Sequence, residues 1–229
     1  MTIFRYALLR GIRNPFSLLC TYLLPIVLIL FRPFWTDGSE AGFSFLVLVT
    51  IGGAYLMSLP IITDKTDGTV LRILAAPITM RRYLAENLLS CAVPLVVQMA
   101  LISLLGMILY DWSLTLSFAV FLCYTVLTVA SVAMAFAWHC LFKSRENSAA
   151  GFSLVLFLTA FLGGVTFPVE VFPGPLEYVG AVFPAYWAVR GIGTVLEAGA
   201  LTEAYWLSIA AMFLFAAAYL LYGGKRRMI

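Results

Sequence analysis

Charged residues are scarce in this chain: they make up only 11% of its 229 residues, whereas 63% of the residues are hydrophobic. A water-soluble domain cannot cover its surface with so few polar side chains. The surrounding solvent must instead be a lipid bilayer, in which helices satisfy their backbone polar groups internally. The composition therefore predicts an all-α, polytopic protein of the cell membrane, and we expect no nucleic-acid partner.

Ionisable residues are almost absent from the interiors of the apolar runs. The exception is Glu86, which stands near the start of one run. Ion-coupled transporters usually keep ionisable groups at membrane depth, because these groups carry the coupling. Their absence argues against a secondary transporter.

A phosphate-binding loop of the form GxxxxGK[ST] is missing too. Gly224-Lys225 has neither the earlier glycine nor the following Ser or Thr, and it comes after an apolar run rather than a strand. The sequence holds no recognisable nucleophile, base or metal-ligand cluster, so we expect neither an enzyme nor a bound cofactor or metal. Energy for uphill transport would have to come from a partner.

The cysteines and the single histidine give no sign of a site. The cysteines lie inside apolar runs at spacings that fit neither a disulfide framework nor a metal site, as expected of small packing residues: Cys20, Cys91, Cys123 and Cys140. His139 stands beside Trp138 near the end of an apolar run. This position is typical of an interfacial packing residue rather than a ligand.

Six apolar runs, each near the roughly 20 residues that cross a bilayer, predict six spans in one transmembrane domain over residues 1–229. The expected spans are Phe16–Phe34, Phe43–Ile62, Leu84–Leu109, Leu114–Phe142, Ala149–Phe167 and Ala204–Tyr222. The first run has no small-residue cleavage site, so we expect it to remain as a span. Residues 1–15 set Arg5, Arg10 and Arg13 opposite an apolar arc, which predicts an interfacial helix in the membrane plane.

Basic residues are distributed unevenly between the two sides of these spans. All Lys and Arg residues except Arg32 and Arg190 fall in the N-terminal arm, two loops and the C-terminal tail. Six spans place these four segments on one side, which the positive-inside rule makes cytoplasmic. We therefore expect both termini in the cytoplasm.

Residues 168–203 form an unusual outer connection. The segment is too apolar for a free loop, but Pro173, Pro175 and Pro184 interrupt it too often for a span. Apolar pieces of about ten residues are typical of re-entrant or interfacial helices. We expect a re-entrant hairpin with two short helices, near Leu176–Phe183 and Ala185–Leu196.

The polar break 63–83 has more internal structure than a simple connection needs. It predicts a turn at Asp67-Gly68, a short helix over Thr69–Ala76, a stop at Pro77 and a new helix start at Thr79. Two interpretations remain open from the residues alone. The short helix either docks on a cytosolic partner or anchors the bundle at the membrane interface.

The same break carries a family resemblance. The stretch DKTDGTVLRILAAPIT resembles the signature of type-2 ABC transporter permeases, roughly E-R-x-x-G-T-x-x-x-L-x-x-x-P-[VI]-[ST]. Thr66 and Leu71 stand where many members carry acids. A second stretch, GGVTFPVEVFP followed by FPAYWAVRG, is similar to the end of that family's fifth span and its outer hairpin, where we identify Phe167, Pro168, Pro184, Tyr186 and Arg190.

The resemblance implies a permease that works with two copies of a cytosolic ABC ATPase and with a second permease subunit, a homodimer being favoured over a heterodimer. ATP and Mg²⁺ would be bound by the ATPase and not by this chain. The loop 64–82 would be the main coupling element, with a lesser contact at Lys143–Asn147. The expected coupling residues are Asp64, Lys65, Asp67, Gly68, Thr69, Arg72, Leu74, Pro77, Arg145 and Glu146.

The resemblance also implies a substrate path between the two permeases. Its expected lining is Gly53, Tyr55, Leu56, Phe157, Phe161, Leu162 and Thr166. Such an apolar lining suits a hydrophobic or amphipathic substrate, such as a drug, a lipid-linked compound or a peptide. The family's default direction is export. The alternatives are an ion-coupled secondary transporter and a non-transporting membrane anchor or assembly factor.

Overall fold

The computed structural model describes residues 2–13, 15–35, 41–75, 78–167 and 178–225, and these ranges contain helices and no strand. The elements are α1 (Thr2–Arg13), α2 (Pro15–Leu18), the π-helix η1 (Leu19–Leu23), α3 (Leu24–Leu30), the 3₁₀ turn η2 (Arg32–Phe34), α4 (Ala41–Thr66), α5 (Thr69–Leu74), α6 (Met80–Tyr110), α7 (Leu114–Leu141), α8 (Arg145–Leu162), α10 (Pro184–Ala198) and α11 (Glu203–Lys225). The predicted all-α class is confirmed for the described residues.

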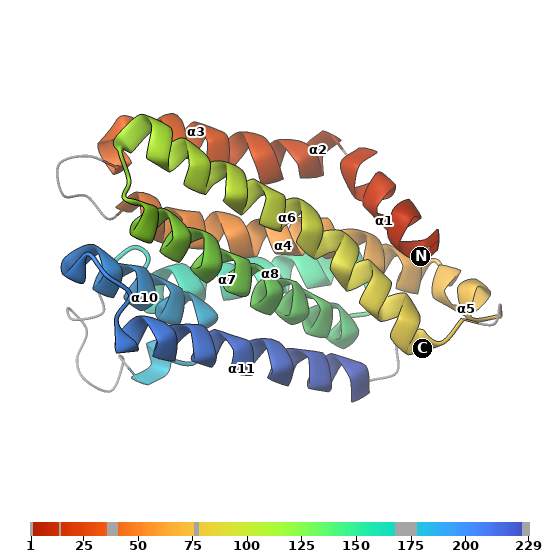
Figure 1. Cartoon of the computed structure of the whole chain (residues 1–229). Helices are drawn as coiled ribbons and strands as arrows, with labels where there is room; N and C mark the ends of the chain where they lie inside the picture. The colour runs from red at the N-terminus through yellow and green to blue at the C-terminus, as the bar shows by residue number, and fades with distance from the viewer. Residues whose placement is uncertain (1, 14, 36–40, 76–77, 168–177, 226–229) are drawn as a thin grey trace.

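Helix α7 is the centre of the bundle, with α4, α6 and α11 packed around it (Figure 1). Its buried face is rich in alanine and serine, whose small side chains let neighbouring helices approach closely. Two tyrosines fix the neighbours at backbone oxygens. Tyr124 of α7 donates to the oxygen of Phe43 at 2.6 Å, and Tyr205 of α11 donates to the oxygen of Ala119 at 2.9 Å.

Four described helices are long and apolar enough to cross a membrane: α4, α6, α7 and α11. They correspond to the second, third, fourth and sixth expected spans. A fifth arises only if α1 and Pro15–Leu30, which bend by 79° relative to each other, form one broken span. The six expected spans are therefore not all confirmed. Helix α8 is not among them, because its polar first turn, which begins with Arg145 and Glu146, makes the helix as a whole too polar.

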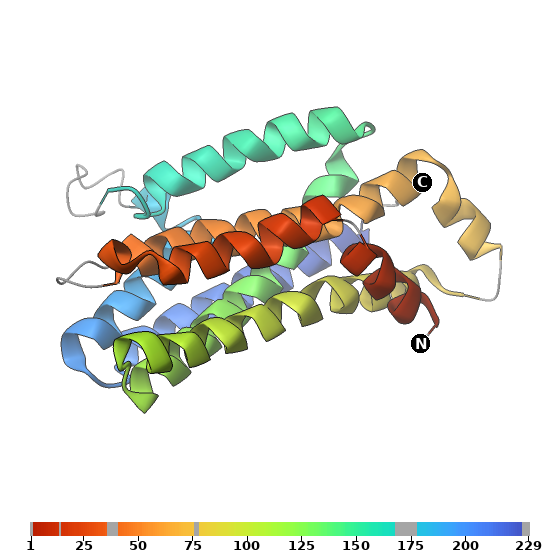
Figure 2. The same ribbon diagram turned by 90° about the horizontal axis from the view of Figure 1, so that it is seen from above.

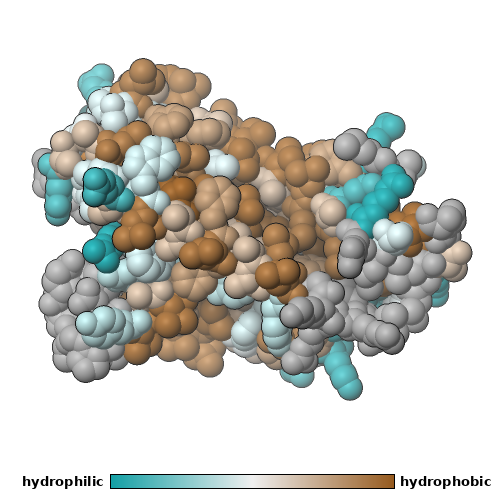
Figure 3. Space-filling view, turned by 60° about the horizontal axis from the view of Figure 1, so that its bottom comes forward, coloured by the Kyte–Doolittle hydropathy of each residue, from teal (hydrophilic) through white to brown (hydrophobic). Residues whose placement is uncertain are grey.

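The bundle has two distinct ends. Helix α1, helix α5 and the end of α11 lie at one of them, and α10 lies at the other (Figures 1 and 2). Figure 3 shows hydrophobic residues over the middle of one face and hydrophilic residues gathered at both ends. The segments that carry most of the basic residues therefore share an end, as the charge pattern predicts.

The connection 168–203, which the sequence predicts to lie on the outer side, is described from residue 178 onward. The second of its two expected short helices is present as α10, which ends at Gly199 with a left-handed φ of 65°. Helix α10 packs on α11 and α7. The first expected helix, Leu176–Phe183, is described only from Tyr178, where one helical turn leads to Gly180. Pro168 and residues 169–177 lie outside the described ranges.

Candidate functional site

The polar break folds locally as its sequence predicts. Helix α4 continues past the expected end of the span to Thr66, and the chain turns at Gly68, whose φ of 69° lies in the left-handed region that favours glycine. Helix α5 follows at once and ends at Leu74, two residues before the expected Ala76. Helix α6 then begins with Thr79 as its N-cap, whose hydroxyl accepts from the N–H of Arg82 at 3.4 Å.

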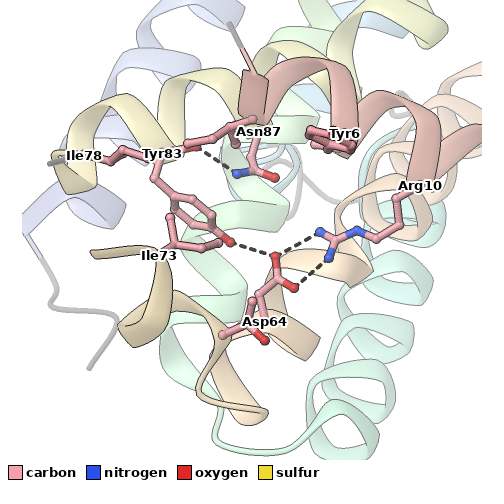
Figure 4. A pocket seen from close by; sticks show the side chains of 10 residues that line it. Tyr6, Arg10, Asp64, Ile73, Ile78, Tyr83 and Asn87 are labelled. Atoms are coloured by element: carbon pink, nitrogen blue, oxygen red, sulfur yellow. Dashed lines mark hydrogen bonds and ion pairs between the residues drawn. The ribbon is translucent and has the colours of Figure 1, made fainter. Parts of the chain in front are cut away.

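Asp64 at the base of this loop is buried and holds three helices together. Its carboxylate accepts two hydrogen bonds from the Arg10 guanidinium, at 2.6 and 2.9 Å, and one from the Tyr83 hydroxyl at 2.9 Å (Figure 4). A buried carboxylate requires such partners, because its desolvation is otherwise costly. The hydrogen bond to Asp64 also raises the pKa of Arg10 above its ordinary value. Asp64 thus ties α4 to α1 and α6.

The first turn of α1 has its own attachment to α6. The N–H of Phe4 donates to Glu86 Oε2 at 2.9 Å, and Arg82 Nε donates to Glu86 Oε1 at 2.9 Å. The carboxylate satisfies one of the unpaired N–H groups at the start of α1, where the helix dipole also favours negative charge. Helix α1 is therefore fastened near both of its ends.

Lys65, the neighbour of Asp64, reaches a different helix. Its Nζ donates to the backbone oxygens of His139 at 3.2 Å, Cys140 at 3.2 Å and Phe142 at 3.0 Å. The last carbonyls of a helix have no partner within the helix, and an ammonium group has three donors to offer them. Lys65 therefore caps the C-terminal end of α7.

His139 lies above this cap in a buried polar junction. Its side chain is fully buried, with one ring nitrogen 2.9 Å from Ser58 Oγ and the other 3.0 Å from Ser148 Oγ. Tyr55 donates to the same Ser148 hydroxyl at 3.2 Å. His139 is therefore a packing residue that joins α4, α7 and α8, while its expected position near the membrane interface stays a prediction. Ser58, a lone serine within an apolar run, was a local signal for this junction, whereas Ser148 follows the polar stretch 143–147.

A cavity of about 420 Å³ opens between α1, α5 and α6 (Figure 4). The Arg10–Asp64 ion pair and Tyr83 form its polar side, and mostly apolar side chains form the rest. The lining residues are Ile3, Tyr6, Ala7, Arg10, Asp64, Thr69, Ile73, Ile78, Tyr83 and Asn87.

The expected coupling residues divide into two groups. Asp64 and Lys65 face the interior of the chain, whereas the exposed or half-exposed ones surround the turn and the start of α8: Asp67, Gly68, Thr69, Arg72, Arg145 and Glu146. Leu74 belongs to α5, but its side chain, like Pro77, lies outside the described part of the chain. Direct contact of these residues with a partner stays a prediction.

The expected path residues do not face one common space. Gly53 lies against Leu95, and Tyr55 stacks on Phe152 of α8 with ring centroids 4.1 Å apart. Both are buried within the subunit. Phe157, Phe161 and Thr166 are instead exposed, and the two remaining residues, Leu56 and Leu162, are half-buried.

The exposed aromatic rings of α8 and the turn after it form a row. Phe157 and Phe161 have ring centroids 6.4 Å apart, and Phe161 meets Phe167 edge-on at 5.5 Å. In the segment expected to form the hairpin, Pro184 is the buried first residue of α10, and the buried Tyr186 hydroxyl accepts from Arg190 Nη1 at 3.1 Å.

Together, these features define a helical, multi-pass membrane protein with a structured loop fastened to one end of its bundle. The sequence model of a family described as ABC-2 family transporter protein matches residues 41–224. No curated protein matches the chain. The match covers well over half of the sequence, so the chain belongs to the ABC-2 transporter family. It is accordingly the permease component of an ABC transporter and works with an ABC ATPase.

Proposed function

We propose that this permease exports a hydrophobic or amphipathic compound across the cell membrane with energy from ATP. A separate cytosolic ABC ATPase, present in two copies, binds ATP and Mg²⁺, and this chain hydrolyses no ATP itself. Two permease subunits form the translocation unit, and identical subunits are favoured over different ones.

The main support for this proposal is the way in which the turn and α5 are attached to the rest of the bundle. Asp67 and Arg72 are exposed around the tip, while Asp64 and Lys65 just before the turn are bonded to α1, α6 and α7. A partner can shift the spans only by pushing on an element that is firmly attached to them. Closure of the ATPase on ATP would displace α5 and bias the bundle between two arrangements.

A second contact supports the same assignment. Arg145 and Glu146 lie exposed in the first turn of α8, at the end of the bundle that carries α1 and α5 (Figure 2). Most of the basic residues belong to segments at this end, so the positive-inside rule makes it cytoplasmic. Both termini then lie in the cytoplasm.

In the proposed arrangement in the bilayer, Pro15–Leu30 and α8 complete six spans. Val27 and Leu30 are more than half exposed, as expected of side chains that face lipid. Helix α1, with its basic arc, lies in the membrane plane, and α10 belongs to a hairpin that re-enters the membrane from the outer side.

The proposed path runs between the two permeases beside the row Phe157, Phe161 and Phe167. Exposed aromatic rings of this kind suit an apolar substrate better than an ion or a free sugar. Export is the direction proposed for the whole assembly.

The test is reconstitution with the ABC ATPase that co-purifies with this chain. Inside-out vesicles that contain both proteins should accumulate a hydrophobic fluorescent dye on addition of ATP and Mg²⁺, and vesicles that contain the permease alone should not. Accumulation driven by an ion gradient without nucleotide would support the secondary transporter instead. If no dye, lipid-linked compound or peptide moves with ATP and the ATPase present, the chain is an anchor or assembly factor.

A further inference from the structure

We propose that Lys65 is a positioning residue that transmits a displacement of α5 to the start of α8 through the C-terminal end of α7. This inference rests on the proposed function, because the ATPase supplies the displacement. It assigns to Lys65 a role inside the permease, whereas the resemblance implies that Asp64 and Lys65 belong to the element that couples to the ATPase.

The first step is the connection from the turn to α7. Lys65 lies two residues before Asp67, the first residue of the turn, and its backbone oxygen accepts from the N–H of Gly68 at 3.4 Å. Its ammonium group offers three N–H donors, and three carbonyl oxygens at the end of α7 lie within 3.2 Å of it. A displacement of the turn therefore acts on backbone atoms of α7. These atoms cannot move independently of the helix, as a flexible side chain could.

The second step leads from α7 to α8. Trp138 Nε1 donates to the backbone oxygen of Ser148 at 3.0 Å, and the His139 ring lies 3.0 Å from the hydroxyl of the same residue. Tyr55 of α4 reaches this hydroxyl as well, at 3.2 Å. Ser148 belongs to the first turn of α8, next to the exposed Arg145 and Glu146. The two loops proposed to meet the ATPase are thus joined inside the permease by one continuous set of hydrogen bonds.

The third step is the contrast with Asp64. Neighbouring residues on a helix point about 100° apart, so two consecutive side chains reach different neighbours. Asp64 binds α1 and α6, whereas Lys65 binds α7. The end of α4 therefore divides into two attachments, and each can be removed without the other.

The experiment measures hydrogen–deuterium exchange in the full chain in nanodiscs. Lys65→Met keeps the length of the side chain and removes its donors. Lys143→Met makes the same charge change at an exposed lysine of the neighbouring loop and serves as the control. We expect amides of residues 139–150 to exchange about tenfold faster in Lys65→Met, since hydrogen bonds to a charged group are lost, with no change in residues 2–13. Asp64→Asn should accelerate exchange in residues 2–13 instead.

A second arm adds the ATPase and a non-hydrolysable ATP analogue. In the wild-type chain, nucleotide should alter exchange at the start of α8. Lys65→Met should still co-purify with the ATPase but lose this response, and Lys65→Arg should restore it. If Lys65→Met exchanges at the same rate as Lys143→Met, the proposed role of Lys65 is wrong. The same holds if Lys65→Met keeps the full nucleotide response. Neither result would contradict the proposed function. Failure of the ATPase to bind the wild-type chain would overturn the proposed function and with it the transmission, whatever the first arm shows.

Discussion

Arg10 and Asp64 form a bidentate ion pair, with N–O distances of 2.6 and 2.9 Å, across 54 residues of sequence. The pair joins α1, which precedes the matched family region of residues 41–224, to the last turns of α4 within that region. Helix α1 is therefore fastened to the same structural unit that presents α5. Whatever moves α5 acts on α1 as well.

Arg10→Met should destabilise the chain, because it leaves the buried Asp64 carboxylate with Tyr83 as its remaining described partner. We expect the free energy of unfolding to fall by about 1.5–3 kcal/mol, the usual worth of hydrogen bonds to a charged group. Arg13→Met, at an exposed arginine of the same helix, should change it by less than about 0.5 kcal/mol. Denaturant unfolding in detergent micelles measures both values.

A double-mutant cycle separates this ion pair from general effects on α1. Asp64→Asn in the Arg10→Met background should cost clearly less than in the wild-type chain, since the uncompensated charge is then removed. Strict additivity of the two substitutions would show that the ion pair does not stabilise the fold.

Contacts in the candidate site could be predicted from the sequence only where the partners lie close together along the chain. The turn at Gly68, helix α5 and the N-cap at Thr79 depend on neighbouring residues, so turn and capping preferences were enough to place them. The partners of Asp64 and Lys65 could not be placed, because Arg10 and His139 lie far away along the chain and meet them only after the helices pack. The resemblance placed Asp64 and Lys65 in the coupling loop but said nothing about which groups inside the chain they bind.

The sequence predicted the lengths of four spans well and the end of the expected fifth span poorly. Continuous hydropathy marks α4, α6, α7 and α11 clearly. The expected fifth span was extended through Phe167, but helix α8 ends at Leu162 and a glycine-containing turn follows. Two adjacent glycines, Gly163 and Gly164, were the local signal for that end, and the apolar residues after them concealed it.

Gly68→Val should weaken coupling to the ATPase without a steric clash. No atom lies within 4 Å of the position that a Cβ would occupy, so the cost comes from the left-handed backbone alone, about 1–2 kcal/mol or more for a β-branched residue. Because the turn and α5 would be displaced, we expect less ATPase to co-purify with this variant. Gly68→Asn should retain binding, since asparagine adopts this conformation more readily. Equal loss of binding in both variants would show that the backbone conformation is not the cause.

Gly106→Ala should disturb the end of the bundle opposite α5. A Cβ at Gly106 would collide with the ring of Trp112. The centroid of that ring lies 5.4 Å from that of Trp35 and 5.1 Å from that of Phe43. We expect a loss of about 1–3 kcal/mol in the free energy of unfolding, as for other overpacked interiors, and a shift in tryptophan fluorescence. Gly52→Ala is the matched control, because the nearest atom to its Cβ would be Leu156 Cδ2 at an ordinary 3.9 Å. A variant at Gly106 as stable as the control would mean that Trp112 is free to move.

Replacement of Phe157 and Phe161 by alanine should lower dye export while leaving the fold intact. The Phe157 side chain is 65% exposed and that of Phe161 41% exposed, so their removal creates no cavity within the subunit. If the substrate passes beside them, transport should fall severalfold, whereas ATPase co-purification and the melting temperature should stay near wild-type values. Phe213→Ala together with Leu214→Ala provides the control, because these residues are exposed to a similar degree on α11, at 53% and 72%. If transport falls equally in the two double variants, the effect is not specific to Phe157 and Phe161. The path would then lie elsewhere.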